Sequence, residues 1–334
     1  MAGRILTLGL TWIGLLLFYL GAGPLVRRIG RRNPKILLYH DCAPAEDSFT
    51  AGLDCTTPPG QFAAHLDYLK RHHRVVDVDV IARGEAPEGA VAITFDDGYR
   101  SVFGHAFPLL AERGFTARTY LISDVLDNAG LVWVNELNHA LRTRPDVTVP
   151  LLDEYFPGCP ADPSTAIDHC RVNFGAEAMD NLLGRLRASL GYDPAEVAAE
   201  ARLYMRWSEI EQMLGAGMTF GNHTRTHPNL ERLSPAEQQR EIAGAQEVLA
   251  ARLPCHSLAY PFGHHSAETA EIARKLGLGS VVEVGGGNRP VDPLALGRVH
   301  LSDQSVAGLF ARMEVVEPIK AALRRRLRKP AIAA

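Results

Sequence analysis

The stretch AVAITFDDGY, residues 90–99, joins an apolar run to two adjacent carboxylates and a glycine. The apolar run, residues 90–95, has the length and the β-branched and aromatic content of a buried strand. Asp96 and Asp97 then leave the strand at its carboxyl end, where Gly98 permits a sharp turn. Neighbouring side chains on an extended backbone point to opposite sides, so the two carboxylates have room for different tasks. A helix N-cap is the alternative for one of them, since helical sequence follows.

The same strand pattern recurs along the chain, separated each time by helical sequence. Strands that alternate with single helices pair in parallel, and seven or so such units predict a closed or nearly closed α/β barrel of seven to eight strands. In such a barrel, functional residues gather at the carboxyl ends of the strands. Strands are predicted over residues 36–40, 90–95, 116–122, 218–224, 257–262, 279–284 and 298–301, and helices over 59–73, 101–114, 207–217, 234–253 and 266–277.

Composition and hydropathy suggest three segments. Residues 5–26 form a run of 22 residues without a charge, which is the length of a bilayer-spanning helix and longer than the apolar core of a signal peptide. We therefore expect a single-pass membrane anchor with its basic flank at residues 1–33. An α/β domain is expected at 34–312, with a mostly helical insertion at 125–206, and a basic tail at 313–334.

Basic residues gather at both ends of a chain whose body is acidic and whose formal net charge is −3. Such clusters suit an anionic lipid surface, so we expect the membrane as a partner, through the N-terminal helix and the tail, and no nucleic acid. By the positive-inside rule, the cluster after the apolar run favours a cytoplasmic domain. The clusters comprise Arg27, Arg28, Arg31, Arg32 and Lys35, and in the tail Lys320, Arg324, Arg325, Arg326, Arg328 and Lys329.

The five cysteines include no CxxC pair, which excludes a zinc ribbon and a thioredoxin-like redox motif. Cys159 and Cys170 flank a short proline-containing loop, and whether they form a disulfide in an oxidising compartment is left open.

A second group of polar residues follows the predicted strand near residue 220. In GNHTRTHPNL, residues 221–230, His223 and His227 lie four apart. If this segment is helical, both imidazoles face one ion. Two imidazoles and a carboxylate form a three-ligand site with an open position for water, which is typical of a catalytic rather than a structural zinc. We therefore predict a divalent cation, zinc first, with cobalt, nickel or iron as alternatives; an ordinary pair of surface histidines is the competing interpretation.

These motifs resemble those of a known family. TFDDG at 94–98 and HTRTH at 223–227 are similar to the first two motifs of the polysaccharide deacetylases, also called NodB-homology proteins or family 4 carbohydrate esterases. AYPFG at 259–263 resembles the aromatic-proline motif that lines one wall of their groove. LLYHD at 37–41 resembles the tyrosine-histidine pair of the exopolysaccharide-modifying branch. The resemblance covers residues 34–302 and implies a distorted NodB-type barrel.

The resemblance also implies a role for each motif residue. Asp97, His223 and His227 would be the metal ligands, and Asp96 the general base that deprotonates the attacking water. The residues expected to contact the substrate are Tyr260, Pro261 and Phe262.

Two positions depart from the commonest family pattern. The late histidine motif that usually supplies the general acid is matched only loosely, so the resemblance favours His40, with His300 in reserve. A structural histidine that closes the first strand is the alternative for His40. The third motif also lacks the arginine that usually orients the base, and Arg298 from another strand is the candidate substitute.

Together, these features imply a metal-dependent hydrolase that removes N-acetyl groups from amino sugars of a polysaccharide. An acetylated amino-sugar glycan is then the expected partner and the periplasmic side of the cell membrane the expected location, against the indication of the arginine-rich flank. Two alternatives stay open: a deformylase or deacetylase of a lipid-linked sugar at the cytoplasmic leaflet, and a catalytically silent, membrane-tethered glycan-binding module. The presence of both carboxylates and both histidines argues against the silent module.

Overall fold

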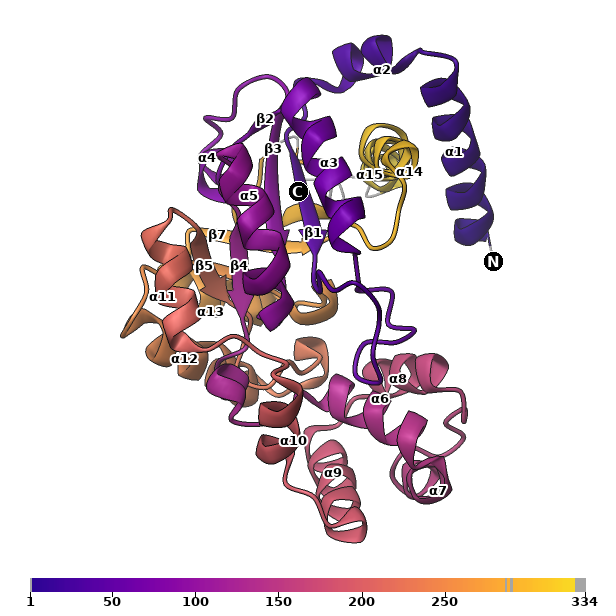
Figure 1. Cartoon of the computed structure of the whole chain (residues 1–334), viewed down its shortest axis with the longest axis vertical. Coiled ribbons are helices and arrows are strands. Elements are labelled where there is room, and N and C mark those ends of the chain that lie inside the picture. The colour runs from indigo at the N-terminus through magenta and orange to yellow at the C-terminus, as the bar shows by residue number, and fades with distance from the viewer. Residues whose placement is uncertain (1, 286, 289–290, 328–334) are drawn as a thin grey trace, which may run out of the picture.

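Seven parallel strands close into a barrel in the computed structural model, which describes residues 2–285, 287–288 and 291–327 (Figure 1). Going round the barrel, β1 pairs with β3, the strands from β3 to β8 pair in chain order, and β8 returns to β1. The predicted parallel barrel is confirmed. The strands are β1 (Lys35–Tyr39), β2 (Arg74–Val75), β3 (Ala90–Phe95), β4 (Arg118–Leu121), β5 (Thr219–Asn222), β6 (Ser257–Ala259), β7 (Ser280–Val284) and β8 (Leu296–His300).

The two-residue strand β2 stands outside this ring. Val91 of β3 pairs with Lys35 of β1 on one side and with Val75 of β2 on the other, so β2 shares with β4 one edge of β3. All residues of β1 and β3 are buried, as expected for strands covered on both faces. A strand of two residues shows no periodicity, so β2 could not be predicted from the sequence.

Helices cover the outside of the barrel, and the predicted ones are confirmed. The segment predicted as one helix over 101–114 begins with a π-helical turn, and α5 starts after it with Pro108 in its first turn. Helix α12 begins with a capping box in which Ser234 N donates to Glu237 Oε2 at 2.8 Å. The helical elements between the strands, outside the insertion, are α3 (Pro59–His72), α4 (Val78–Ala82), η1 (Val102–Ala106), α5 (Phe107–Arg113), η2 (Ser123–Asn128), α11 (Trp207–Gly215), η3 (Leu230–Arg232), α12 (Pro235–Ala250), η4 (Pro261–Gly263) and α13 (Ala267–Lys275).

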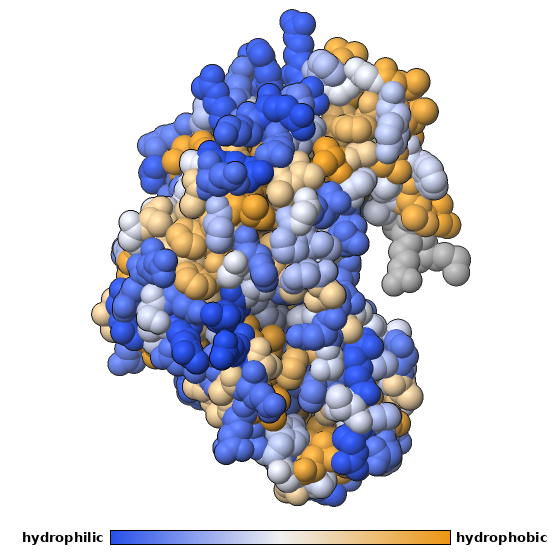
Figure 2. Space-filling model, in the orientation of Figure 1, coloured by the Kyte–Doolittle hydropathy of each residue, from blue (hydrophilic) through white to orange (hydrophobic). Residues whose placement is uncertain are grey.

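The apolar N-terminal run folds as two helices, so the single transmembrane helix predicted over residues 5–26 is wrong. Helix α1 (Ala2–Tyr19) ends before Gly21, whose φ is 74°, and α2 (Gly23–Gly30) starts with Pro24 in its first turn. A left-handed glycine and a proline ring both interrupt helical hydrogen bonding here. In the part of the chain that is described, no helix has both the length and the apolar character needed to cross a bilayer. Figure 2 shows hydrophobic residues on the surface at the upper right, where Figure 1 places α1 and α2.

A helical stretch near the C-terminus packs between α1 and the barrel (Figure 1). The backbones approach closely, since a Cβ atom added to Gly14 of α1 would lie 2.6 Å from Cβ of Ala311. Gly14 therefore permits this packing. The stretch consists of α14 (Val306–Phe310), η5 (Ala311–Val316) and α15 (Glu317–Leu327).

The predicted basic tail is helical as far as it is described. Lys320 Nζ lies 3.0 Å and Arg324 Nη2 3.6 Å from the carboxylate of Glu317, so part of its charge is paired locally. Arg328 and Lys329 lie outside the described residues.

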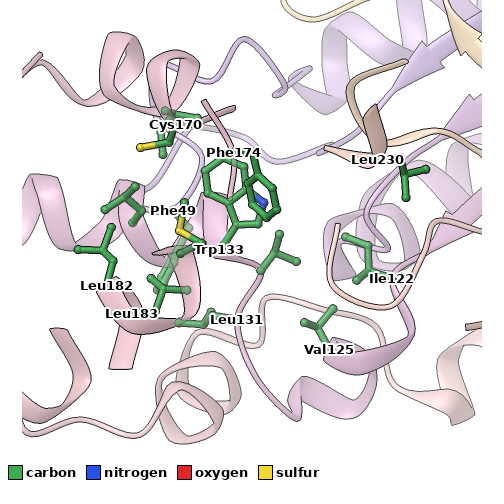
Figure 3. Packing of buried hydrophobic residues seen from close by; sticks show 14 of the residues in the cluster. Phe49, Ile122, Val125, Leu131, Trp133, Cys170, Phe174, Leu182, Leu183 and Leu230 are labelled. Atoms are coloured by element: carbon green, nitrogen blue, oxygen red, sulfur yellow. The ribbon is translucent and has the colours of Figure 1, made fainter. Parts of the chain in front are cut away.

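Five helices occupy most of the predicted insertion and pack around an apolar core that continues into barrel residues such as Ile122 and Leu258 (Figure 3). Trp133 and Phe174 lie in this core with Leu182 and Leu183, and Phe49 from the loop after β1 joins them. The insertion is thus packed against a barrel loop. Cys159 and Cys170 are free thiols within it. The helices are α6 (Trp133–Thr143), α7 (Pro145–Tyr155), α8 (Pro163–Val172), α9 (Ala176–Leu190) and α10 (Pro194–Ala201).

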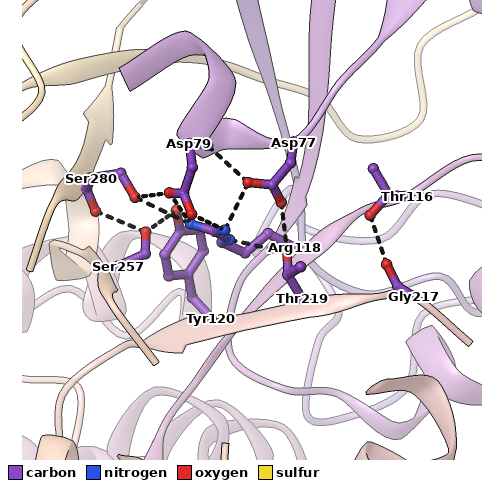
Figure 4. A network of polar contacts seen from close by, with 9 residues as sticks. All are labelled: Asp77, Asp79, Thr116, Arg118, Tyr120, Gly217, Thr219, Ser257 and Ser280. Atoms are coloured by element: carbon purple, nitrogen blue, oxygen red, sulfur yellow. Dashed lines mark hydrogen bonds and ion pairs between the residues drawn. The ribbon is translucent and has the colours of Figure 1, made fainter. Parts of the chain in front are cut away.

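A polar network closes the amino-terminal end of the barrel around Arg118, the first residue of β4 (Figure 4). The Arg118 Nη atoms lie 2.8 Å from Asp77 Oδ1 and 2.8 Å from Asp79 Oδ1, and the arginine side chain is 5% exposed. Ser280 Oγ donates to Asp79 Oδ1 at 2.6 Å. Two carboxylates thus balance the charge of one buried guanidinium. This network lies at the end of the barrel opposite to Asp96 and Asp97, which follow the carboxyl end of β3.

Replacing Arg118 with methionine should lower the free energy of unfolding by about 3 kcal/mol, since it leaves two partly buried carboxylates without their cation. The urea midpoint measures this loss. In the matched control Arg83→Met, the ion pair with Glu85 is exposed on both sides, and the midpoint should hardly move. Equal midpoints for the two variants would contradict the role assigned to the network.

Candidate active site

A pocket of about 460 Å³ opens at the carboxyl ends of the barrel strands. Asp96 and Asp97 reach it from the end of β3, His223 from the end of β5, Tyr260 from the end of β6 and His40 from the end of β1. Parallel strands in a barrel end at one face, and this brings residues far apart in the sequence together. The strand-end positions inferred from the sequence therefore meet in one pocket.

The backbone around the pocket is held in an uncommon conformation. Asp97, Thr224, His227 and Phe262 have φ values of 70°, 67°, 61° and 58°. Non-glycine residues rarely adopt this left-handed region, at a cost of about 1–3 kcal/mol each, and such residues concentrate at functional sites. Gly98, with φ of 75°, continues the turn after Asp97. The surrounding packing therefore maintains a geometry that the isolated loops would not favour.

Asp97, His223 and His227 converge as a possible metal site. Asp97 Oδ1 lies 3.4 Å from His223 Nε2 and 3.5 Å from His227 Nε2, and one ligand atom from each residue lies within 4.8 Å of the others. Atoms that bind one tetrahedral zinc at about 2.0–2.1 Å lie about 3.4 Å apart. Asp97 Oδ1 is buried, and within the described structure it has no hydrogen-bond partner. The spacing and this unpartnered oxygen fit a cation held by the three residues.

The protonation preferences of the three groups also suit metal binding. Burial lowers the pKa of His227 to about 4, so its imidazole is neutral at physiological pH. Burial alone would raise the pKa of Asp97, but the two histidines hold it below its ordinary value. Burial opposes a charge on His223 as well, yet the carboxylates of Asp96 and Asp97 raise its pKa. A cation bound between the three side chains would replace the proton that His223 otherwise carries on the nitrogen facing Asp97.

Both imidazoles are fixed by contacts with the surrounding chain. His223 Nδ1 lies 2.8 Å from the carbonyl oxygen of Ala259, so a proton on Nδ1 leaves Nε2 to face Asp97. Trp133 Nε1 of the insertion donates to the carbonyl oxygen of His227 at 2.9 Å. The insertion therefore supports one of the candidate ligands directly.

The local structure of the histidine motif differs from the one that the sequence suggested. The i, i+4 spacing of the histidines suggests a helical turn, but the segment after β5 is an irregular loop in which Thr224 and His227 have positive φ. Thr224 Oγ1 accepts from His227 N at 3.1 Å and Asn222 Oδ1 accepts from Thr224 N at 2.8 Å. Side-chain hydrogen bonds, rather than a helix, bring the two imidazoles together.

Asp96 is held by Arg298 in a bidentate contact. Nη1 and Nη2 of Arg298 each lie 2.6 Å from one of the two carboxylate oxygens, and the arginine side chain is 0% exposed. Burial alone would raise the pKa of Asp96, but the Arg298 guanidinium and His223 keep it below its ordinary value. Asp96 Oδ2 lies 3.6 Å from His223 Nε2, so this ionised carboxylate borders the candidate metal site. Arg298 comes from the middle of β8. It therefore contacts Asp96 from a different strand than the AYPFG motif, which lacks the arginine that the resemblance led us to expect.

Two further histidines line the pocket on the side of β1 and β8. The rings of His40 and His300 lie edge to face with their centroids 5.4 Å apart. His40 Nδ1 is buried and has no hydrogen-bond partner among the described residues. Burial, together with the proximity of His40, lowers the pKa of His300 to about 3. Both candidates for the general acid therefore lie in the pocket, and His300 is neutral at physiological pH.

Aromatic residues form the opposite wall. Tyr260 and Phe262 line the pocket. Pro261 is buried in the turn between them and is not among the described residues that line it. The Phe262 ring lies 4.6 Å from that of His227, and the Arg171 guanidinium lies 5.6 Å from the Phe262 ring centroid. The wall thus adjoins the candidate ligands on one side and the insertion on the other.

The insertion contributes residues to the pocket that were not predicted from the sequence. Asn135 comes from α6 and Ile167, Asp168 and Arg171 come from α8. Ser164 Oγ of α8 donates to a carbonyl oxygen of the loop after β1 at 3.0 Å, which ties the two segments together. The helical sequence of α6 and α8 does not indicate that these residues reach the pocket, because their position depends on how the insertion packs against the barrel.

Comparisons with known proteins agree with the fold and the motifs. A family model described as polysaccharide deacetylase matches residues 83–281. The protein YxkH of Bacillus subtilis (strain 168), which is named for the same activity, is 21% identical over 277 residues, covering 80% of this chain and 71% of YxkH. A deacetylase from Streptococcus pyogenes, PplD, solved with acetate, superposes with a TM-score of 0.56 at 19% identity, covering 84% of this chain and 98% of PplD. IcaB from Ammonifex degensii superposes with a TM-score of 0.51 at 22% identity, covering 84% of this chain and 97% of IcaB.

Proposed function

The chain belongs to the polysaccharide deacetylase family, a family of hydrolases, and from this premise we propose that it uses a divalent cation to remove N-acetyl groups from amino sugars within a glycan. The observation that carries the proposal is the convergence of Asp97, His223 and His227 beside an ionised Asp96. The proposal includes the cation, the acyl group and the role of each residue.

Asp97, His223 and His227 are the residues that would hold the cation. When bound there, it would polarise the acyl carbonyl and lower the pKa of a bound water. Zinc is the first choice because two imidazoles and one carboxylate suit it, although cobalt, nickel and iron accept the same ligands.

Asp96 and His40 carry out the two proton transfers. Asp96 accepts a proton from the attacking water, whose oxygen bonds to the acyl carbon. Arg298 keeps Asp96 ionised and fixes its orientation through the bidentate contact. As the bond between the acyl carbon and the nitrogen breaks, His40 donates a proton to the departing amine, and acetate is the second product. The aromatic wall at Tyr260 and Phe262 would position the sugar.

His40 is preferred over His300 as the general acid on electrostatic grounds. A general acid must carry a proton at the operating pH, and with a pKa of about 3 His300 is a poor proton reservoir. A neutral His300 beside His40 can still accept or relay a hydrogen bond. We therefore assign His300 a supporting position and leave proton donation to His40.

Replacing His40 with alanine should lower acetate release by about 10²–10⁴-fold, the usual contribution of a general acid, while zinc content is unchanged. Acetate release and metal analysis on the same preparation give both values. In parallel, His300→Ala should have the smaller effect. If His40→Ala turns over normally and His300→Ala does not, the acid is His300.

The test of the function itself is an acetate-release assay over a panel of acetylated glycans, with and without a chelator. Release that disappears with chelator and returns with zinc supports the proposal. Release that is insensitive to complete metal removal overturns the role of the cation. Glycan binding without acetate release at full zinc occupancy would instead identify a silent binding module.

A lipid-linked sugar at the cytoplasmic leaflet is the second candidate substrate, and the arginine residues of α2 and its C-terminal flank favour it because the negative surface potential of that leaflet attracts basic residues. A topology reporter fused after Ala334 distinguishes the two compartments, since a periplasmic signal excludes this candidate and supports a periplasmic glycan.

A further inference from the structure

An apolar surface covers the N-terminal helices. Of the fifteen large hydrophobic side chains that are exposed in the described structure, ten lie between residues 5 and 29. Soluble proteins rarely expose a contiguous patch of this kind unless it contacts a partner or a membrane. We call it the N-terminal apolar face; its members are Ile5, Leu6, Leu8, Trp12, Ile13, Leu16, Tyr19, Leu20, Leu25 and Ile29.

The face follows from the way α1 packs. Leu10 and Gly14 are buried, and Gly14 lies against Ala311 of η5. On the other side, Trp12 and Leu16 are 70% and 58% exposed and lie one helical turn apart. A helix that is apolar on all sides needs a second apolar environment beyond the protein it already contacts. One side of α1 therefore packs against the rest of the protein, and the other side is exposed and needs an external apolar partner.

Basic residues lie next to this face. Every charged residue between positions 5 and 40 is basic. In α2, the exposed Arg28 lies within one turn of Leu25 and Ile29, so its guanidinium borders the apolar surface. Arg32 is 73% exposed just beyond the helix, although it contacts Glu88. A partner that covers the face therefore meets apolar surface first and positive charge at the rim.

We propose that the N-terminal apolar face docks into the interfacial region of an anionic lipid bilayer, with α1 in the plane of the membrane. The chemistry fits this partner. Trp12 and Tyr19 combine apolar rings with a polar edge and suit the headgroup level, and the long arginine side chain reaches from an apolar surface to phosphate. An amphipathic arrangement of apolar anchors beside arginine is typical of helices that lie on membranes.

A second copy of the chain is the competing occupant, and the charges disfavour it. A two-fold dimer places the same patch of each protomer face to face. Arg28 would then meet its own copy at the rim. Glu88 pairs with Arg31 and Arg32, but among the described residues no carboxylate pairs with Arg28 to supply a negative charge. Anionic headgroups supply that charge.

Vesicle co-sedimentation of the full chain tests the proposal. Binding should be stronger to mixed phosphatidylglycerol and phosphatidylcholine vesicles than to phosphatidylcholine alone. The double variant Trp12→Ser/Leu16→Ser should lose at least about tenfold of the partition coefficient on both. Arg28→Gln should lose about fivefold on the anionic vesicles only. The matched controls Val248→Ser and Arg240→Gln change an exposed hydrophobic and an exposed arginine of α12, and they should bind like the parent chain.

The outcomes separate the occupants. Binding that survives Trp12→Ser/Leu16→Ser overturns the proposal. A vesicle-free dimer that this double variant dissociates would assign the face to a second copy. Quenching of Trp12 fluorescence by brominated lipids, measured against Trp12→Phe, reports depth: bromines near the headgroup should quench more than bromines at the bilayer centre, and the reverse order overturns the in-plane position. Vesicle binding is read without catalysis, so it stands apart from the proposed hydrolysis.

Discussion

Asp96→Asn is expected to lower acetate release by about 10²–10⁴-fold, because it removes the carboxylate that we propose takes the proton of the attacking water. The asparagine has almost the same volume, and its Oδ1 can still accept from one Nη atom of Arg298, although its NH2 group cannot accept from the other. The candidate ligands are untouched, so zinc content should stay at one ion per chain. Acetate release and metal analysis on the same preparation measure both quantities.

The matched control for this change is Asp180→Asn, an exposed aspartate of α9 in the insertion. It should retain parental activity and zinc. Normal turnover in Asp96→Asn would show that another group takes the proton, and the contact with Arg298 would then be structural. Loss of zinc in Asp96→Asn would instead move this residue into the set of metal ligands.

Asp97→Ala is expected to remove both the cation and the activity. Asp97 Oδ1 lies 3.4 Å from His223 Nε2 and 3.5 Å from His227 Nε2, so its loss leaves two imidazoles and no charged ligand for the cation. Zinc affinity should fall by more than about a hundredfold, since even outer contacts to metal ligands are worth 10- to 100-fold. Competition with a fluorescent zinc chelator measures the affinity. His223→Ala should behave in the same way.

His256→Ala is the control for the histidine variant, because His256 is exposed and precedes β6 rather than following a strand. Zinc content and activity should both be unchanged there. Acetate release by an Asp97→Ala protein shown to be free of metal would refute the metal-dependent scheme. Zinc binding with unchanged affinity in Asp97→Ala would show that the three side chains do not share an ion.

The sequence was sufficient to predict the residues that follow strands. Asp96, Asp97 and His223 each come directly after an apolar run, and the rule that parallel strands end at one face of a barrel brings them together without further information. The same reasoning was incomplete for His227. Its position relative to His223 depends on a loop with left-handed residues, which the spacing of the motif does not reveal.

Contacts that depend on long-range packing were harder to predict. Arg298 reaches Asp96 because β8 closes the barrel beside β1, and the sequence offered Arg298 only by analogy with a missing arginine. The hydrogen bond from Trp133 to the carbonyl of His227 depends on how a whole insertion docks. At the N-terminus, hydropathy predicted one spanning helix because an average over the run does not register the turn at Gly21.

Barrel closure by the last strand also has a consequence for the order of biosynthesis. Asp96 and Arg298 are separated by 202 positions, so at about 5–20 residues per second the carboxylate waits about 10–40 seconds on the ribosome for its guanidinium. During that interval β1 has an open edge where β8 will later lie. The nascent chain therefore lacks the contact that orients Asp96 until translation is nearly finished, and the open edge of β1 is available to a chaperone during that interval.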